Sequence, residues 1–529
     1  MDLAPTLAAW SRLGAVDRPA PPTGRRFVVV HLDGVSRRAL DLALRAGLMP
    51  TLSRWLNEGS HALLPTVSGM PASTPAFQAA LFYGDRGDCP GYSWFDKRRG
   101  KSVRMDDARE VLRFENALRE RAAGILRGGS TYFSILGGEA EEPSFSMRRL
   151  ALGFPFGGKD DPQKNGWDRL ATWLAHALPL ARSLARGIRG APERLLDSLA
   201  WSLEKGTARH EPRYLLQRFV LADLGQEFTT WMTVLDVCRG VPAIYAVFAG
   251  YDEVAHRRGP YAPAALAELA AADRALARIA EAIRLRPEFG YELFVLSDHG
   301  QEATRPAERV LHGVRLADWI LAGGPTSAQW TTPSPGADAD PLHRVCGARL
   351  LRGGGEAGRP PLVVVEAGDL AHVYFRDRET PHDLPSLARR WPAELRATLA
   401  CPAAGMVLVR GGRCGFAFVR GRRIDLAEPA SLRGLIGYDT DLLGRFLREM
   451  IATPSAGDLV VLGAGVPGGD VAFAWEFGSH GGVGTGGVKS FFIHPTSLDL
   501  DHLRGSGPIE LHAFFRSRYL GAPDHGGDL

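Results

Sequence analysis

The sequence predicts an α/β protein in which helices sandwich a mostly parallel sheet. Two observations carry this prediction. First, continuous apolar runs of strand length recur along the chain, and strands buried in a parallel sheet read in this way. Second, four such runs end in acidic or histidine side chains, at 27–34, 246–256, 293–300 and 471–481. Because open α/β sheets bind ligands beyond the carboxyl ends of their strands, these endings indicate a functional edge.

The composition is that of an ordinary globular protein. The chain has 529 residues, 45% hydrophobic and 23% charged, which suits two or three domains or one large domain with insertions. The net charge of +4 arises from 63 basic and 59 acidic residues. This balance gives no signature of a nucleic-acid partner, and composition leaves the oligomeric state open.

Cysteine usage and targeting patterns favour a reducing compartment. The five cysteines form no Cys-x-x-Cys motif for zinc or redox chemistry. Residues 1–22 do not read as a secretory signal. No apolar run reaches the roughly 18 residues that a membrane span needs. We therefore expect a cytoplasmic protein by default, with export left open if a leader was removed before this numbering.

The first elements alternate between strand and helix. Ser73 is expected to open a helix, since serine is a preferred N-cap and Pro75 is tolerated in a first turn. Gly84 can end that helix. The elements expected before it are an N-terminal arm (1–24), a strand (27–32), a helix (about 37–58) and a second strand (61–65).

Two long stretches interrupt this pattern and are predicted to be insertions. Residues 85–235 have few strand-like runs and read as a mainly helical cap, with a long helical segment at 167–206. Residues 313–456 contain several strand-like runs and read as a small α+β subdomain. The core would then comprise 25–84, 236–312 and 457–520, with strands ending at Asp252 and covering 291–296, 459–462 and 471–477, and a helix at about 262–285.

Acidic and histidine side chains at the strand ends point to metal binding. Zinc accepts histidine nitrogens and carboxylate oxygens, and a ligand set rich in histidine favours zinc over magnesium. Two neighbouring ions can clamp the attacking and leaving oxygens of a phosphoryl transfer. The candidate ligands, enough for two divalent cations, are Asp33, Asp252, His256, Asp298, His299 and His480.

Two adjacent hydroxyls, on Ser73 and Thr74, are candidate nucleophiles. An N-cap side chain lies next to backbone N–H groups without intrahelical partners, and such a helix end favours an anion. Ser73 in the N-cap position is therefore expected to carry the chemistry, with Thr74 as the alternative and as a substrate-binding residue. The competing interpretation is that Ser73 only caps the helix.

Three of these motifs resemble the alkaline phosphatase superfamily, in its type I phosphodiesterase/nucleotide pyrophosphatase branch. Asp252-Glu-Val-Ala-His256-Arg-Arg-Gly259-Pro260 is similar to the branch's Asp-x-x-x-His-x-x-Gly-Pro motif. Ser297-Asp298-His299-Gly300 is similar to its Ser-Asp-His-Gly motif, and His480-Gly481 resembles its C-terminal metal histidine. The matching stretches, 27–84, 241–300 and 470–495, are a minority of the chain.

The resemblance implies an alkaline-phosphatase-like fold and a role for each ligand. One metal would be held by Asp252, His256 and His480, and the other by Asp33, Asp298, His299 and the nucleophile oxygen. The family's usual metal is zinc, with manganese in related mutases. The family places its nucleophile two residues before a proline, which selects Ser73. Lys97 is a candidate phosphate contact, although the basic run 97–99 also reads as solvated surface.

The resemblance implies a two-metal phosphodiesterase or nucleotide pyrophosphatase that acts on a small-molecule or lipid phosphate ester through a phosphoseryl intermediate. Phe77 stands where sulfatases of the superfamily require arginine, so sulfatase activity is disfavoured. The alternatives are a phosphomonoesterase or phosphomutase on the same metals, and a catalytically silent metal-binding scaffold. Residues 160–206 interleave leucine and tryptophan with arginine, which fits either peripheral membrane contact or simple packing on the core.

Overall fold

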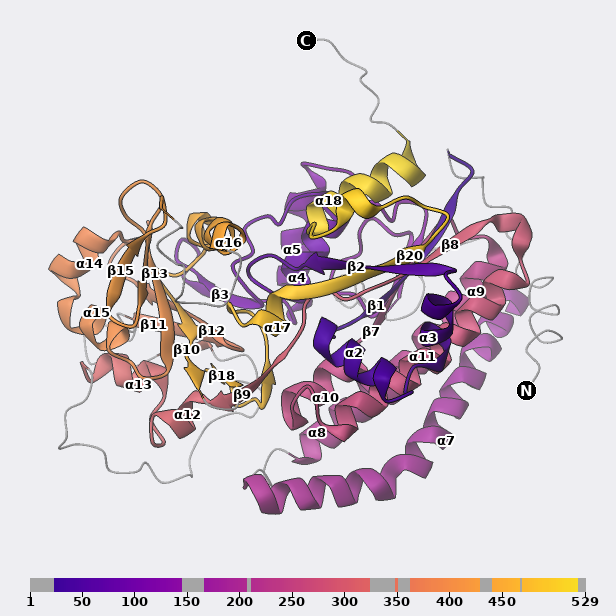
Figure 1. Ribbon diagram of the computed structural model, residues 1–529, viewed down its shortest axis with the longest axis horizontal. Coiled ribbons are helices and arrows are strands. Elements are labelled where there is room, and N and C mark those ends of the chain that lie inside the picture. The colour runs from indigo at the N-terminus through magenta and orange to yellow at the C-terminus, as the bar shows by residue number, and fades with distance from the viewer. Residues whose placement is uncertain are drawn as a thin grey trace, which may run out of the picture.

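A computed structural model describes residues 23–144, 166–206, 211–323, 348–350, 362–428, 440–466 and 469–521. Its core is a seven-stranded sheet with helices on both sides, so the predicted fold class is confirmed (Figure 1). Only β20 runs antiparallel to its neighbours. In spatial order the strands are β2 (His61–Val67), β20 (Lys489–Pro495), β8 (Tyr291–Leu296), β1 (Arg26–Leu32), β7 (Ala243–Phe248), β5 (Ser130–Tyr132) and β6 (Glu142–Ser144).

Strand β1 shows why the sheet is covered on both faces. Its residues alternate between two apolar cores, with Val28 and Val30 in one and Phe27 and Val29 in the other. The first core is formed with α2 (Arg37–Arg45), α3 (Pro50–Asn57), α9 (Gln226–Arg239) and α11 (Pro263–Arg284). The second is formed with α4 (Thr74–Tyr83), α5 (Ala108–Arg119), α18 (Pro508–Phe515) and η6 (Arg516–Leu520).

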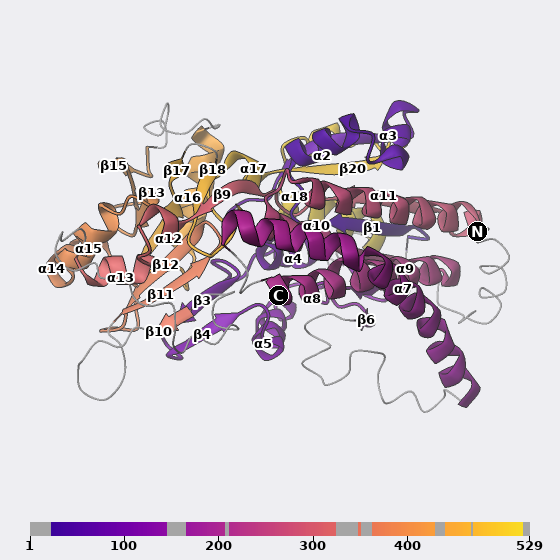
Figure 2. The same cartoon turned by 90° about the horizontal axis from the view of Figure 1, so that it is seen from below.

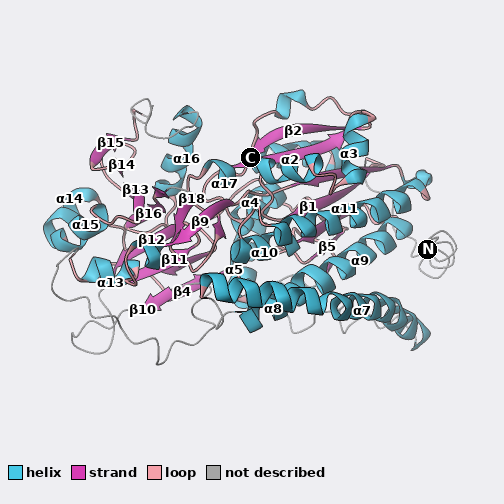
Figure 3. Ribbon diagram, turned by 60° about the horizontal axis from the view of Figure 1, so that its bottom comes forward, coloured by secondary structure: helices cyan, strands magenta, loops and turns pink. Residues whose placement is uncertain are grey.

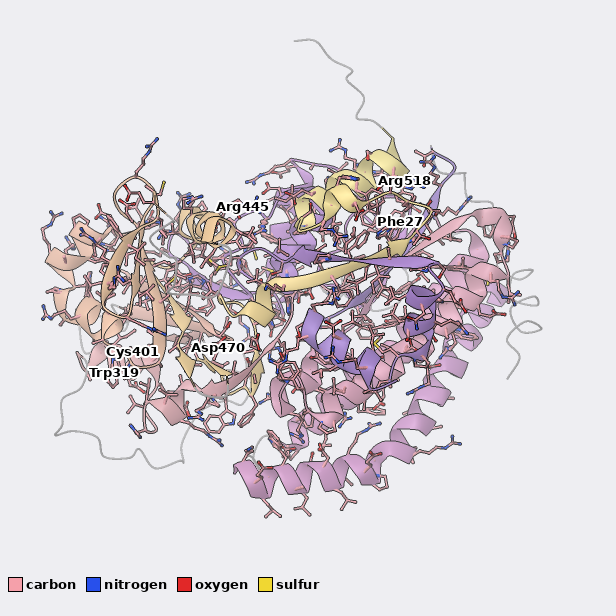
Figure 4. All side chains as sticks on the ribbon, viewed as in Figure 1. Phe27, Trp319, Cys401, Arg445, Asp470 and Arg518 are labelled. Carbon is pink, nitrogen blue, oxygen red and sulfur yellow. The ribbon has the colours of Figure 1, made fainter. Side chains whose placement is uncertain are left out.

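The second core closes over the start of β1. The Phe27 ring lies 5.0 Å from that of Phe515 and 4.6 Å from that of Tyr519. Phe27 and Arg518 mark this corner in Figure 4. Because Arg518 pairs with Glu292 of β8, the C-terminal helices are tied to the sheet that they cover.

A second, antiparallel sheet of seven strands lies beside the core (Figure 1). Helices pack on it, as Figure 3 shows by element type; they are α13 (Leu316–Leu321), α14 (Leu384–Arg390), α15 (Pro392–Leu399) and α16 (Thr440–Ala452). The strands in order are β10 (Ala348–Leu350), β11 (Leu362–Ala367), β12 (Leu370–Phe375), β16 (Leu459–Gly463), β13 (Ala404–Val409), β14 (Phe416–Val419) and β15 (Arg422–Asp425).

Smaller elements join the two sheets. One is a four-stranded sheet with the order β17 (Gly465–Val466), β18 (Gly469–Ala472), β9 (Glu302–Pro306) and β19 (Gly478–Ser479). The other is a two-stranded sheet, in which β3 (Ser93–Asp96) pairs with β4 (Lys101–Arg104). The remaining helical segments are α7 (Gly166–Lys205), α8 (Glu211–Arg218), η1 (Phe219–Gly225), α10 (Gly250–Arg258), η2 (Pro287–Phe289), α12 (Ala307–Val310), α17 (Thr485–Val488) and η5 (Asp501–Leu503).

Several expected elements differ in the structure. The helix expected at about 37–58 is two helices, since Pro50 starts α3 and offers no N–H to continue α2. The run at 459–462 is β16, which lies in the second sheet and not in the core sheet, because it pairs with β12 and β13. The run at 471–477 contributes β18 to the small sheet.

Part of the predicted cap at 85–235 belongs to the core. Strands β5 and β6 extend the core sheet beyond β7, and α9 packs in the core beside α11. Figure 2 shows α7 and α8 on the outside of these elements. The expected arm lies, except for its last two residues, outside the described residues. Among the described residues no helix has the length and apolar character to cross a bilayer.

Asp273 ties α11 to α3 and yields a stability prediction. Its two carboxylate oxygens accept from the N–H groups of Thr51 and Leu52, both at 2.9 Å, and the residue is buried. These are first-turn N–H groups of α3, which has no side-chain cap of its own. Asp273→Ala should lower the free energy of unfolding by about 2 kcal/mol in urea titration.

Glu281→Ala, on the same helix, is the matched control. Glu281 is half-exposed, and its one ion-pair partner among the described residues is Arg284, one turn away, so its loss should change the free energy of unfolding by less than about 0.5 kcal/mol. Equal effects of the two substitutions would show that Asp273 does not act as a cap.

Candidate metal centre

The register of the core sheet brings ligands from three strands to one edge. His31 of β1 lies opposite Val247 of β7 on one side and Leu296 of β8 on the other. The three strands are parallel, so the residues that follow them leave the sheet at the same end. Asp33 follows β1, helix α10 follows β7, and Asp298 follows β8.

One group of ligands comes from α10 and the segment after β19. Asp252 and His256 are one helical turn apart, with His256 Nε2 3.2 Å from Asp252 Oδ2. His480 follows Ser479 of β19, and its ring centroid lies 5.1 Å from that of His256. One ligand atom from each of these three residues lies within 4.8 Å of the others, so the group has the dimensions of a cation site.

A second group adjoins the first. His299 Nε2 lies 3.2 Å from Asp298 Oδ2 and 3.9 Å from Asp33 Oδ1. Asp252 also lies within reach of Asp33 and His299, and the rings of His299 and His480 stack with centroids 3.7 Å apart. The structure thus brings all six sequence-predicted ligands into one cluster, in which Asp33 groups with His31 and Asp298 as well as with Asp252 and His299.

The three histidines present the same nitrogen to the centre. Nδ1 of His256 lies 2.9 Å from the Gly478 carbonyl oxygen. Nδ1 of His480 lies 2.7 Å from that of Ala72, and Nδ1 of His299 lies 3.2 Å from that of Gly300. A carbonyl oxygen only accepts, so each contact requires a proton on Nδ1 and leaves Nε2 able to ligate a metal.

The electrostatics of the cluster fit divalent cations. The pKa of Asp33 lies well above its usual range, because burial desolvates the carboxyl and because Asp298 and Asp252 add negative charge. Burial alone would also raise the pKa of Asp252, but the neighbouring histidines, led by His256, outweigh it and hold that pKa below its usual range. Asp298 Oδ2 is buried with no hydrogen-bond donor among the described residues. Cations would compensate these carboxylates.

Gly34 lets two of the carboxylates approach each other. Its φ is +70°, and a Cβ there would lie 2.2 Å from Asp252 Oδ1. Its N–H lies 3.3 Å from Asp298 Oδ1. A side chain at this position would separate the segments that carry Asp33 and Asp252.

The start of α4 carries the two candidate nucleophiles, and they differ in position. Thr74 Oγ1 lies 3.4 Å from Asp33 Oδ1 and 3.3 Å from His299 Nε2. Ser73 is the N-cap, as expected, but its Oγ makes no cap bond and has no hydrogen-bond partner among the described residues. Of the two hydroxyls, that of Thr74 is the one with hydrogen-bond contacts to the cluster.

Lys97, the other candidate for phosphate binding, is committed elsewhere. Its Nζ lies 3.0 Å from Asp458 Oδ2, and the carboxylate of Asp458 is fully buried. Asp458 precedes β16, whose far end pairs with Leu370 of β12. That end lies near the cluster, because a Cβ on Gly481, the residue after His480, would lie 3.3 Å from Leu370 Cβ. Lys97 thus lies at the opposite end of the second sheet from the cluster, and we no longer assign it to the substrate.

Sequence reasoning missed the residues that hold the ligands. His31 Nε2 lies 2.9 Å from Asp298 Oδ1, and its Nδ1 lies 3.0 Å from the Tyr245 hydroxyl. Gln301 donates to Asp252 Oδ1, and Glu476 Oε2 lies 3.3 Å from His256 Nδ1. A histidine inside an apolar strand, two residues before Asp33, was the available signal for His31.

Comparisons with known proteins agree with this geometry. A family model described as type I phosphodiesterase/nucleotide pyrophosphatase matches residues 27–399. No curated protein matches the chain.

The solved structures that match the chain include two enzymes. Phosphonoacetate hydrolase from Sinorhizobium meliloti 1021, in complex with phosphonoacetate, is 17% identical with a TM-score of 0.50, over 96% of this chain and 97% of that one. Murine ectonucleotide pyrophosphatase/phosphodiesterase 5 is 11% identical with a TM-score of 0.45, over 95% of this chain and 98% of that one. The first of these supports the α/β fold described above.

The contact of His31 with Asp298 generates a prediction about metal affinity. His31→Gln should weaken binding of the ion nearest Asp298 by about tenfold, because residues behind a ligand orient it. Competition with a chromophoric zinc chelator measures the change. His494→Gln is the control, since that histidine lies on β20, where its Nδ1 contacts the Pro495 carbonyl and its ring stacks on Phe492. Equal affinities of the two variants would mean that His31 does not support the centre.

Proposed function

We propose that this chain cleaves phosphate diesters with Thr74 as its nucleophile. The chain belongs to the type I phosphodiesterase/nucleotide pyrophosphatase family of the alkaline phosphatase superfamily. Members of this family are metal-dependent phosphoester hydrolases. The observation that carries this proposal is the position of the Thr74 hydroxyl, 3.4 Å from Asp33 and 3.3 Å from His299 at the start of a helix. The substrate would be a small-molecule phosphate ester.

The six ligands fit two cations. Asp252, His256 and His480 would hold one, and Asp33, Asp298 and His299 would hold the other beside Thr74. Three Nε2 atoms and three carboxylates favour zinc, with manganese as the alternative. When bound, the two cations would supply positive charge for the ionised hydroxyl and for the oxygens of the transferred phosphoryl group.

The chain's own residues supply attack and orientation. Thr74 Oγ, after losing its proton to solvent, would form a bond to phosphorus while the bond to one ester oxygen breaks and that oxygen takes up a proton, which gives a free alcohol and a threonyl phosphodiester that keeps the second ester group. Water would then release a phosphate monoester and restore the threonine hydroxyl. Helix α4 begins at Thr74, so N–H groups of its first turn lack intrahelical partners and can accept the anionic phosphoryl oxygens.

Thr74 and Ser73 are distinguished by substitution. Thr74→Ala should lower kcat/KM on bis-p-nitrophenyl phosphate by about 10³-fold or more, because the attacking atom is lost. Thr74→Ser keeps that atom and should retain activity within about tenfold of the parent enzyme. Mass spectrometry of the acid-quenched reaction should find a p-nitrophenyl phosphoryl group on Thr74.

Ser73→Ala is the matched control on the neighbouring residue. Its Oγ makes no cap bond, so kcat/KM should change by less than about tenfold. A full loss in Ser73→Ala with activity kept in Thr74→Ala would return the role to Ser73 and a phosphoseryl intermediate.

Metal removal tests the centre and ranks the remaining functions. Dialysis against a chelator should abolish diester cleavage, and about two equivalents of zinc or manganese per chain should restore it. Faster turnover of p-nitrophenyl phosphate than of the diester would identify a phosphomonoesterase or mutase. Tight retention of metal with no turnover across a panel of phosphate esters would identify a silent metal-binding scaffold.

A further inference from the structure

Helix α7 exposes a continuous row of large apolar side chains. The row, called the α7 stripe below, consists of Leu184, Ile188, Leu195, Leu196, Leu199 and Leu203, exposed by 43% to 80%. Leu184, Ile188, Leu195, Leu199 and Leu203 follow one another at spacings of four and seven residues, which places them on one side of the helix, and Leu196 lies at the edge of this row. Among the described residues only Leu321 and Ile509 are comparably exposed large hydrophobics outside α7, α8 and η1. So marked a concentration in one place indicates an interaction surface.

The opposite side of α7 is fixed to the body of the protein. Arg194 pairs with Asp223 of η1. Asp197 Oδ2 accepts from Arg258 Nε of α10 at 2.9 Å. The Trp201 ring lies 5.2 Å from that of Phe477. These contacts hold the stripe outward, and α7 lies along the outer margin of the molecule (Figures 2 and 3).

The charge of α7 indicates what the stripe meets. Between Asp168 and Glu193 its sequence contains four arginines, Arg169, Arg182, Arg186 and Arg189, and no acidic residue. An apolar face combined with arginine is the pattern of a helix that lies in a membrane interface. We propose that the α7 stripe is a docking surface for an anionic lipid bilayer, a role that goes beyond the hydrolysis proposed above and does not depend on it.

A second copy of the chain is a poorer occupant of the same surface. Two α7 helices packed stripe to stripe in parallel would bring their acid-free, arginine-bearing segments together, and like charges repel. Leu195, Leu199 and Leu203 repeat every four residues, whereas a coiled-coil seam alternates three and four. Gly187, Gly190 and Pro192 further interrupt a regular seam. An anionic bilayer offers complementary charge and requires no matching register.

Vesicle sedimentation tests the proposal with the full-length, metal-loaded chain. The protein should sediment with vesicles of phosphatidylcholine and phosphatidylserine, and more weakly with phosphatidylcholine alone. Leu195→Gln/Leu199→Gln/Leu203→Gln should lower the partition coefficient by about tenfold or more, because three exposed side chains no longer enter the apolar phase. Arg182→Gln/Arg186→Gln/Arg189→Gln should cause a loss of about tenfold or more on anionic vesicles.

Leu321→Gln/Ile509→Gln is the matched control, since these two residues have exposures of 43% and 44% but lie away from α7. This control should bind vesicles as the parent chain does. The leucine, arginine and control variants should all keep the melting temperature of the parent chain and its rate of hydrolysis of a soluble diester. Failure of the parent chain to sediment, or equal binding by all variants, would overturn the proposal. A dimer lost in the leucine variant, without vesicle binding, would overturn it in favour of self-association.

Discussion

The crowding of three carboxylates at one edge of the sheet is the constraint on which the rest of the site depends. Asp33, Asp252 and Asp298 leave three parallel segments so close together that Gly34 has no room for a side chain beside Asp252. Burial and mutual repulsion raise the pKa of Asp33 well above its usual range. Carboxylates gathered in this way must either take up protons or be compensated by opposite charge, and divalent cations supply that charge most compactly.

The surroundings of the cluster fix the ligands before any cation arrives. Backbone carbonyls hold Nδ1 of the three histidines, so the Nε2 atoms converge. His31 and Gln301 each contact a carboxylate, Asp298 and Asp252 respectively. The hydroxyl of Thr74 reaches the cluster because α4 starts at that residue, and the same start leaves N–H groups for an anion. The fold therefore places the candidate ligands and the candidate nucleophile at one edge of the sheet.

The sequence was sufficient for features that are local and insufficient for those set by distant partners. The six candidate ligands could be found because each follows an apolar run or a short motif such as 252–260. Residue type did not reveal that the Thr74 hydroxyl contacts Asp33 and His299, because that depends on which way the side chain faces at the start of α4. Lys97 finds its partner Asp458 far along the chain. An apolar run such as 459–462 predicts a strand but not the sheet that it joins.

Anomalous diffraction from crystals grown with zinc tests the central claim most directly. The account predicts two zinc peaks about 4 Å apart. One should lie about 2.0–2.2 Å from ligand atoms of Asp252, His256 and His480, and the other at the same range from Asp33, Asp298 and His299, with Thr74 Oγ1 facing it. A single peak, or zinc bound away from these six residues, would contradict a two-metal centre at the carboxyl edge of the sheet.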